Sequence, residues 1–154
     1  MVLNLRLLRL LRNKMYVQLF GINYWSLEDF NIVKTYTDDR ANKIKNGQIE
    51  YKLYVKNEQS EPIGTFIFRL GTGQIGFAYV KDEYKNGGIG TEMIKLLTKD
   101  KINYDGSGEL FVVTTKNHPF WMKMPNNSGF ITPACSSVTG GGYRFNLTDK
   151  INEV

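Results

Sequence analysis

The pattern of apolar and polar residues is most regular between residues 74 and 98. Apolar and aromatic side chains fill residues 75–80, which is typical of a largely buried strand. Residues 81–90 contain three glycines and no run of apolar side chains. A core-facing helical stripe follows, formed by Ile89, Met93, Leu96 and Leu97. The pattern therefore predicts a strand, a tight glycine-rich turn and a helix in succession.

The rest of the chain divides into short segments of the same kinds. Ser26 to Asp29 has the shape of a capping box and predicts a helix through Tyr36, and Thr37 predicts the start of a second, short helix ending at Asn46-Gly47. Strands are predicted at 16–21, 49–56, 63–70, 110–115, 130–136 and 143–147, and a short helix at 117–124. The predicted order is β-αα-βββ-α-β-α-ββ.

The glycine cluster predicts an anion site at the start of the helix. The first backbone N–H groups there are unpaired, and the positive end of the helix dipole points to the same place, so a phosphate-bearing cofactor is expected on residues 88–91. No Walker A pattern occurs in the chain. A dinucleotide fingerprint is excluded because Met93 stands where its third glycine is needed. A kinase glycine loop joins two strands, whereas this one opens a helix.

The segment Lys85-Asn-Gly-Gly88-Ile-Gly90 resembles the acetyl-coenzyme A loop of the GNAT N-acetyltransferase superfamily, R/Q-x-x-G-x-G/A, with Lys in place of Arg or Gln. The predicted element order is also that of the family, and the resemblance extends over about residues 16–147, including Gly129-Phe130. It implies a mixed α/β (α+β) fold, with a mostly antiparallel central sheet flanked by helices. An ordinary glycine-rich turn into a core helix is the alternative interpretation.

The resemblance also implies how acetyl-CoA binds as a cosubstrate. Backbone N–H groups of residues 85–91 hold the pyrophosphate, and the splayed end of the strand near Val80 pairs with the pantetheine arm. The implied cofactor-binding residues are Ala78, Val80, Lys85, Asn86, Gly87, Gly88, Ile89, Gly90, Thr91 and Asn117. Asn117 also fits a simple helix cap.

Acetyl transfer to an amine requires a neutral acceptor, stabilisation of the thioester oxygen and a proton for the departing thiolate. By the family's spacing, Gln74 occupies the usual position of the base and Pro125 that of the acid. The remaining catalytic candidates are Gln74 as an orienting group, Tyr79 and Tyr143. His118 and Cys135 are weaker candidates, since a single histidine before proline is usually a cap and a single cysteine is usually an apolar core residue.

The resemblance places the amine acceptor between the two N-terminal helices and the last hairpin. Tyr36, Asp38 and Asp39 are therefore the acceptor candidates, the two acids as attractants of a cationic amine. A solvated helix start is the alternative interpretation of both acids. The glycines at 140–142 form either a loop that closes over the acceptor or a plain turn.

Charge is concentrated at the N-terminus. The net charge is +5, yet residues 1–27 hold four basic side chains and no acid, so the remaining residues carry 16 basic against 15 acidic groups. This near-neutral domain disfavours nucleic acid as a partner. We divide the chain into a Leu/Arg-rich extension, residues 1–14, and a single domain, residues 15–154. The extension is a targeting or membrane-surface helix, a helix packed on the domain or a partner, or an upstream addition before Met15.

Composition bears on the cellular compartment and on membrane and metal binding. A single cysteine favours a reducing, cytoplasmic compartment, with organellar targeting by the extension as the alternative. No apolar run is long enough for a transmembrane span, and no residues have the spacing of a metal site. We expect a monomer or homodimer.

The sequence therefore predicts an acetyl-CoA-dependent N-acetyltransferase that acts by direct transfer in a ternary complex. The acceptor is a primary amine of a small molecule, peptide or protein. The alternative is a catalytically degenerate protein of the same fold that serves as an interaction or structural component, with or without bound CoA.

Overall fold

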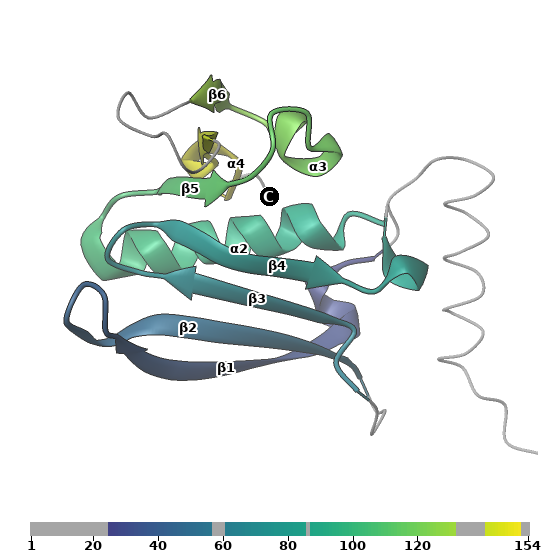
Figure 1. The fold of residues 1–154 in the computed structure, drawn as a ribbon. Helices are drawn as coiled ribbons and strands as arrows, with labels where there is room; N and C mark the ends of the chain where they lie inside the picture. The colour runs from purple at the N-terminus through teal and green to yellow at the C-terminus, as the bar shows by residue number, and fades with distance from the viewer. Residues whose placement is uncertain (1–24, 57–60, 86, 132–140, 152–154) are drawn as a thin grey trace, which may run out of the picture.

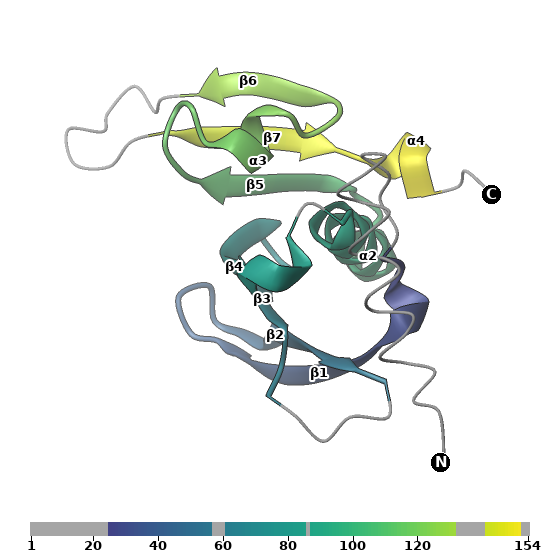
Figure 2. The ribbon, with the colours of Figure 1, turned by 90° about the vertical axis from the view of Figure 1, so that its right-hand side faces the viewer.

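The computed structural model describes residues 25–56, 61–85, 87–131 and 141–151. Seven strands form one sheet in the order β1-β2-β3-β4-β5-β7-β6, and β4 and β5 are the parallel pair among otherwise antiparallel neighbours (Figures 1 and 2). The strands are β1 (Phe30–Asp39), β2 (Ile44–Val55), β3 (Gly64–Arg69), β4 (Gln74–Val80), β5 (Glu109–Val113), β6 (Asn127–Ile131) and β7 (Gly142–Asn146). The helices are η1 (Leu27–Asp29), η2 (Asp82–Tyr84), α2 (Ile89–Asp105), α3 (Pro119–Met122) and α4 (Thr148–Ile151). This confirms the mixed α+β class and the mostly antiparallel sheet.

Most of the predicted elements are confirmed from residue 49 onwards. The strand at 74–80 matches β4 at both ends, and the helix after the glycine turn is α2, the longest helix described. The predicted strand at 16–21, Cys135 and much of the predicted strand at 130–136 lie outside the described residues. The short helix α4 was not predicted.

The predicted helix pair over residues 26–46 is wrong. The capping box forms, with the Ser26 N–H donating to Asp29 Oδ2 at 3.0 Å, but it is followed by only a single 3-10 turn. Residues 30–39 then form β1, which pairs with β2 from Phe30↔Val55 to Asp39↔Ile44. The segment is rich in β-branched and aromatic residues, which fit a pleated surface, and the ladder with β2 decides the outcome.

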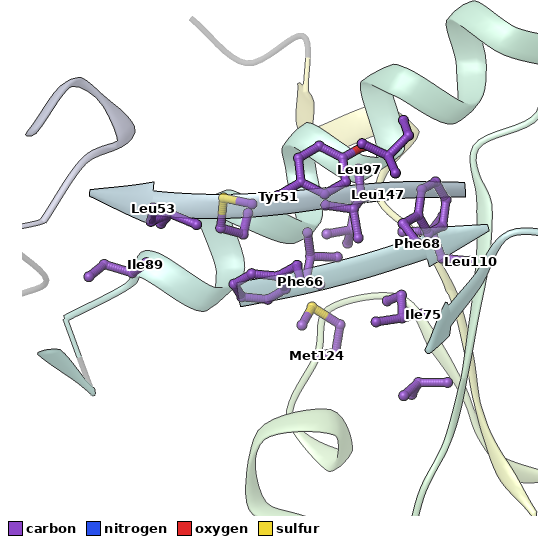
Figure 3. Close-up of a cluster of buried hydrophobic side chains, with 14 of the residues drawn as sticks. Tyr51, Leu53, Phe66, Phe68, Ile75, Ile89, Leu97, Leu110, Met124 and Leu147 are labelled. Carbon is purple, nitrogen blue, oxygen red and sulfur yellow. The ribbon is translucent and has the colours of Figure 1, made fainter. Parts of the chain in front are cut away.

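One face of the sheet carries the core, and we call it the inner face. Tyr51, Phe66 and Phe68 point from β2 and β3 toward α2, whose Ile89 and Leu97 are fully buried (Figure 3). Figure 2 shows α2 lying along this face, where the sheet curves around the helix. The opposite, outer face has no helix over it in the described part of the chain. This asymmetry leaves the outer face of β4 accessible.

A polar group ties α2 to the inner face. The Tyr51 hydroxyl donates to Asp100 Oδ2 at 2.7 Å, and Lys34 Nζ on β1 donates to the same oxygen at 2.8 Å. Burial raises the pKa of Tyr51 far above its usual range, and the Asp100 carboxylate adds to the rise. The tyrosine is therefore a neutral donor, and α2 is fixed in position against β1 and β2.

Candidate functional site

Strands β4 and β5 separate soon after they meet. They pair only at Gln74↔Phe111 and Ile75↔Val112, although β4 continues to Val80. On its other edge β4 contains a bulge, because Ile67 and Phe68 of β3 pair with Phe77 and Ile75 and leave Gly76 unmatched. A bulge bends a strand and increases its twist, which turns β4 away from β5. We call the region between β4 beyond Ile75 and β5 beyond Val112 the wedge.

The β4 edge in the wedge is accessible to solvent. The four residues 76–79 are all exposed, in contrast to the alternating burial of β3. The prediction of a largely buried strand is therefore wrong for β4, because no described strand or helix covers this edge. Within the described residues, their backbone N–H and C=O groups on the β5 side have no strand partner. An extended chain with amide groups can add to such an edge as an extra strand would.

The wedge opens toward the glycine turn that begins α2. Strand β4 leads through η2 to Gly88, which is the N-cap of α2 with φ of 91° and no side-chain cap. This left-handed conformation explains the need for glycine at 88. The first N–H groups of the 17-residue helix are therefore not occupied by a capping side chain, and they point toward the positive end of its dipole. The geometry suits an anion such as a pyrophosphate.

Two other glycines of the turn are required by packing. A Cβ at Gly87 would collide with the indole of Trp25, and a Cβ at Gly90 would lie 2.9 Å from Phe120 Cε2. Trp25 also donates its backbone N–H to the Gly87 carbonyl at 3.3 Å, and its ring centroid lies 5.3 Å from that of Tyr84. These contacts explain the two glycines without a ligand. They also pack the turn against Trp25 and Phe120.

Trp25 and Phe120 were missed by sequence reasoning. Trp25 precedes the first described strand, and Phe120 belongs to α3, so neither is near the glycine turn in the chain. No local pattern links either aromatic residue to a glycine. Only the fold brings Trp25 to Gly87 and Phe120 to Gly90.

Lys85, the residue in place of the family's Arg or Gln, forms an ion pair. Its Nζ lies 2.9 Å from Asp82 Oδ1. The hydrogen bond and charge of this pair raise the pKa of Lys85 and lower that of Asp82, and Tyr79 makes a smaller contribution to the shift of Lys85. Both groups are thus charged at neutral pH. Exposed pairs of this kind are weak, so Lys85 is available for exchange to a phosphate. Asn86 lies outside the described residues.

The catalytic candidates are distributed around the wedge. Gln74 lies at its closed end on the outer face, and Tyr79 lies on the same face near the open end. Tyr143 is buried on the inner face, where its hydroxyl donates to the Lys116 carbonyl. The structure brings Gln74 and Tyr79 to one face of β4 and places Tyr143 on the other side of the sheet.

A polar pocket of about 370 Å³ lies at the closed end of the wedge. Gln74 and Phe111, the last pair before the strands part, contribute to its wall. Its charged members are already paired: Lys101 with Asp105, and Arg144 with Glu109 at 3.3 Å. The full lining is Thr72, Gln74, Lys101, Ser107, Glu109, Leu110, Phe111 and Arg144.

The N-cap of helix α3, in the segment after β5, is not the residue that the sequence suggested. His118, not Asn117, is the N-cap of α3, because its Nδ1 accepts the Phe120 N–H at 3.3 Å. Asn117 is exposed beside this cap. Pro125 lies three residues after the end of α3 and is exposed.

The acceptor candidates on β1 do not reach the wedge. The aligned pairs Thr37↔Gln48, Gln48↔Arg69 and Arg69↔Gln74 place their end of β1 three strands from β4. Asp38 accepts the Asn46 N–H at 3.0 Å. Asp39 accepts from the Asn42 side chain at 2.9 Å, and this bond is the main cause of its lowered pKa. Both carboxylates therefore hold the β1–β2 turn. Since residues 26–46 are not a helix pair, the expected acceptor site between helices is absent from this part of the described chain.

Packing explains the glycine at the start of β7. Gly142 is buried, and a Cβ there would collide with the Val112 carbonyl. Gly141 accepts the Thr114 N–H at 3.2 Å, whereas Gly140 is outside the described residues. These two glycines hold β5 against β7.

Neither a cluster of metal ligands nor a membrane-spanning helix occurs among the described residues. No group of three or more His, Cys, Asp or Glu side chains in this part of the chain is arranged to hold a metal ion. Among the described helices, none has the length and apolar character needed to cross a membrane.

Comparisons with known proteins add little. No protein-family model matches the chain, and no curated protein matches its sequence. Among solved structures, the chain is similar to a GNAT-family acetyltransferase from Staphylococcus aureus Mu50, with 13% sequence identity and a TM-score of 0.49 over 95% of this chain and 96% of that one. This similarity is too low to assign the family.

Proposed function

We propose that the protein is an acetyl-CoA-dependent N-acetyltransferase. The observation that carries the proposal is the wedge, which opens toward the uncapped start of α2. A pyrophosphate fits the free N–H groups of residues 89–91, with Lys85 as a supporting cation. The amide-bearing pantetheine arm then lies along the unpaired edge of β4 between Gly76 and Val80. Asn117, beside α3, and Asn86, which lies outside the described residues, are the remaining proposed contacts.

Transfer then occurs within the wedge, in a ternary complex. The acetyl carbonyl lies near the bulge, where a free backbone N–H of β4 stabilises the oxygen as it gains charge. Orientation of the two reactants supplies a further part of the acceleration. Tyr79 is the proposed proton donor because it lies on the accessible edge, and Gln74 orients a water or the acceptor. The Tyr143 hydroxyl donates a hydrogen bond to the Lys116 carbonyl, so we assign Tyr143 a structural role beside β5 and no part in proton transfer.

Isothermal titration calorimetry with acetyl-CoA tests the binding step. Thr91 is at the third position of α2, where an acidic side chain is favourable for the helix. In Thr91→Glu the carboxylate competes for the anion site, so we expect binding at least about tenfold weaker with no loss of folding stability. The neutral, nearly isosteric Thr91→Gln is the control and should bind as the wild type does. No heat of binding with the wild type rejects the proposal.

One observation favours a second function. Gln74 and Pro125 occupy the positions where the family usually has its base and acid, which fits a protein that retains CoA and has lost turnover. Such a protein would serve as an interaction or structural component. It would bind acetyl-CoA in calorimetry but release no CoA thiol with any amine. Mass spectrometry of amine and protein pools incubated with labelled acetyl-CoA separates the two functions.

A further inference from the structure

Three exposed apolar side chains lie on the outer face of the two strands that border the wedge. Phe77 and Tyr79 on β4 are each 48% exposed, and Val113 on β5 is 49% exposed. Phe77 and Tyr79 share this face because they pair with Ile67 and Thr65, whose neighbour Phe66 points into the core. We call these three residues the apolar rim. Exposed apolar side chains that share one face beside an unpaired strand edge are candidates for contact with a ligand.

Among the described residues, the wedge is closed on its inner face, so an acceptor approaches from the side of this rim. On the inner face, Ile75, Val112 and Met93 of α2 are buried in the core. A molecule that reaches an acetyl group between β4 and β5 therefore passes Phe77, Tyr79 and Val113. The apolar character of the rim therefore favours acceptors that can pack against it.

The described part of the wedge has no side chain suited to remove a proton from an ammonium group. Beyond Ile75 and Val112, the titratable group on the two strands is the phenol of Tyr79. At the closed end, Gln74 does not titrate and Glu109 is paired with Arg144. The Nδ1 of His118 is used to cap α3. A positioned general base typically contributes about 10²–10⁴ in rate, and alkylamines, which are protonated at pH 7, need one.

We propose that the acceptor is a weakly basic aromatic amine whose ring packs on Phe77, Tyr79 and Val113. This inference rests on the proposed acetyltransferase function. Conjugation of the nitrogen lone pair with the ring keeps an arylamine neutral at pH 7, so no base is required before attack. The aromatic rim binds the ring by offset or edge-to-face contacts. Two independent features, the apolar rim and the lack of a base, thus select the same class of amine.

The step balances without another reactant. The nitrogen lone pair attacks the thioester carbonyl carbon, and an N–C bond forms. The C–S bond then breaks and its electron pair leaves with sulfur. One proton moves from nitrogen to the CoA sulfur, by way of Tyr79 or a water, which gives the N-aryl acetamide and CoA thiol.

The test compares two amines that share a ring. The full chain is incubated with acetyl-CoA and either p-anisidine or 4-methoxybenzylamine, which differ by one methylene and by whether the amine is neutral at pH 7. At pH 7 we expect kcat/KM at least about tenfold higher for p-anisidine. Between pH 7 and 9 the arylamine rate should be nearly constant, while the benzylamine rate should rise by up to about tenfold per pH unit with its neutral fraction. Products are identified by mass spectrometry.

A variant pair tests the rim itself. Phe77→Ala is expected to raise KM for p-anisidine by about tenfold or more, with the dissociation constant for acetyl-CoA unchanged. Val33→Ala is the control, because Val33 is 49% exposed on the outer face of β1, far from the wedge. It should leave both constants unchanged.

The outcomes separate this inference from the proposed function. Faster transfer to 4-methoxybenzylamine at pH 7, or an unchanged KM in Phe77→Ala, would overturn the arylamine assignment while acetyl-CoA binding still stood. Absence of acetyl-CoA binding by the wild type would remove the proposed function, and the inference with it.

Discussion

The two edges of β4 have opposite properties. Toward β3, its residues are paired from Gln74↔Arg69 to Val80↔Gly64, with Gly76 as the unmatched one. Toward β5, only Gln74 and Ile75 are paired. One edge therefore belongs to the framework and the other remains open for a ligand. A single strand can thus supply both stability and a binding surface, provided that the two demands fall on different edges.

The largest expected effect is a loss of folding stability on the β3 side of β4, where the strands are paired. Phe68→Ala removes a ring that is fully buried on the inner face of β3, and we expect the free energy of unfolding to fall by about 3–5 kcal/mol. Phe77→Ala, on the open strand, should change it by no more than about 0.5 kcal/mol. Urea denaturation measures both. Equal losses would mean that side chains on the open strand contribute as much to stability as those packed in the core of β3.

A smaller loss of folding stability is expected at Tyr51, which connects β2 to α2 through a hydrogen bond. Tyr51→Phe removes the hydrogen bond to the Asp100 carboxylate and should destabilise the fold by about 1.5–3 kcal/mol near pH 7. The raised pKa of Tyr51 makes this contribution pH-dependent, since it is complete below the unfolded pKa of about 10 and is lost as pH rises above it. Unfolding measured from pH 8 to 11 should show the wild type approaching the variant. A constant difference over that range would contradict the raised pKa.

At the open end, the glycine turn is expected to be sensitive to added volume. Gly87→Ala directs a methyl group into the Trp25 indole and should destabilise the fold by about 1–3 kcal/mol while weakening acetyl-CoA binding. Combining it with Trp25→Phe, which makes room, should restore part of the loss. A double-mutant cycle with coupling of at least about 0.5 kcal/mol supports the contact, and strict additivity would argue against it.

The smallest effect on folding is expected at Lys85. Lys85→Gln should leave thermal stability unchanged, because the pair with Asp82 is on the surface. Affinity for acetyl-CoA should fall about three- to tenfold at low ionic strength, and the difference should disappear in 1 M salt. Calorimetry at two salt concentrations provides the measurement. A salt-independent loss would point to a structural role for the lysine.

The sequence was sufficient to locate β4 and α2 and to identify their types, because their signals are local. A continuous apolar run and a stripe of 3.6-residue period each identify one element without reference to the rest of the chain. Residues 30–36 carry no such distinction. Their apolar positions fit either a helix stripe or a half-buried strand, and the ladder with β2, which starts at residue 44, decides between them.

The candidate site was predictable to a similar extent. The start of α2 at Gly88, without a side-chain cap, follows from the glycine cluster and the onset of the helical stripe, whereas the anion site itself stays a prediction. The contacts of Trp25 with Gly87 and of Phe120 with Gly90 join segments that are distant in the chain. The separation of β4 from β5 depends on how β3 pairs across Gly76, which no pattern within β4 reveals.

The bulge at Gly76 has a consequence for how such a site arises. Without Gly76, Ile75 and Phe77 would follow one another directly, and each would keep its present partner and its present face on β3. The ladder would be regular, and β4 would have no reason to turn away from β5. In genetic terms, one codon separates a plain sheet from a wedge. A single insertion could therefore have created the binding edge in an existing domain without disturbing the hydrophobic contacts on which that domain depends.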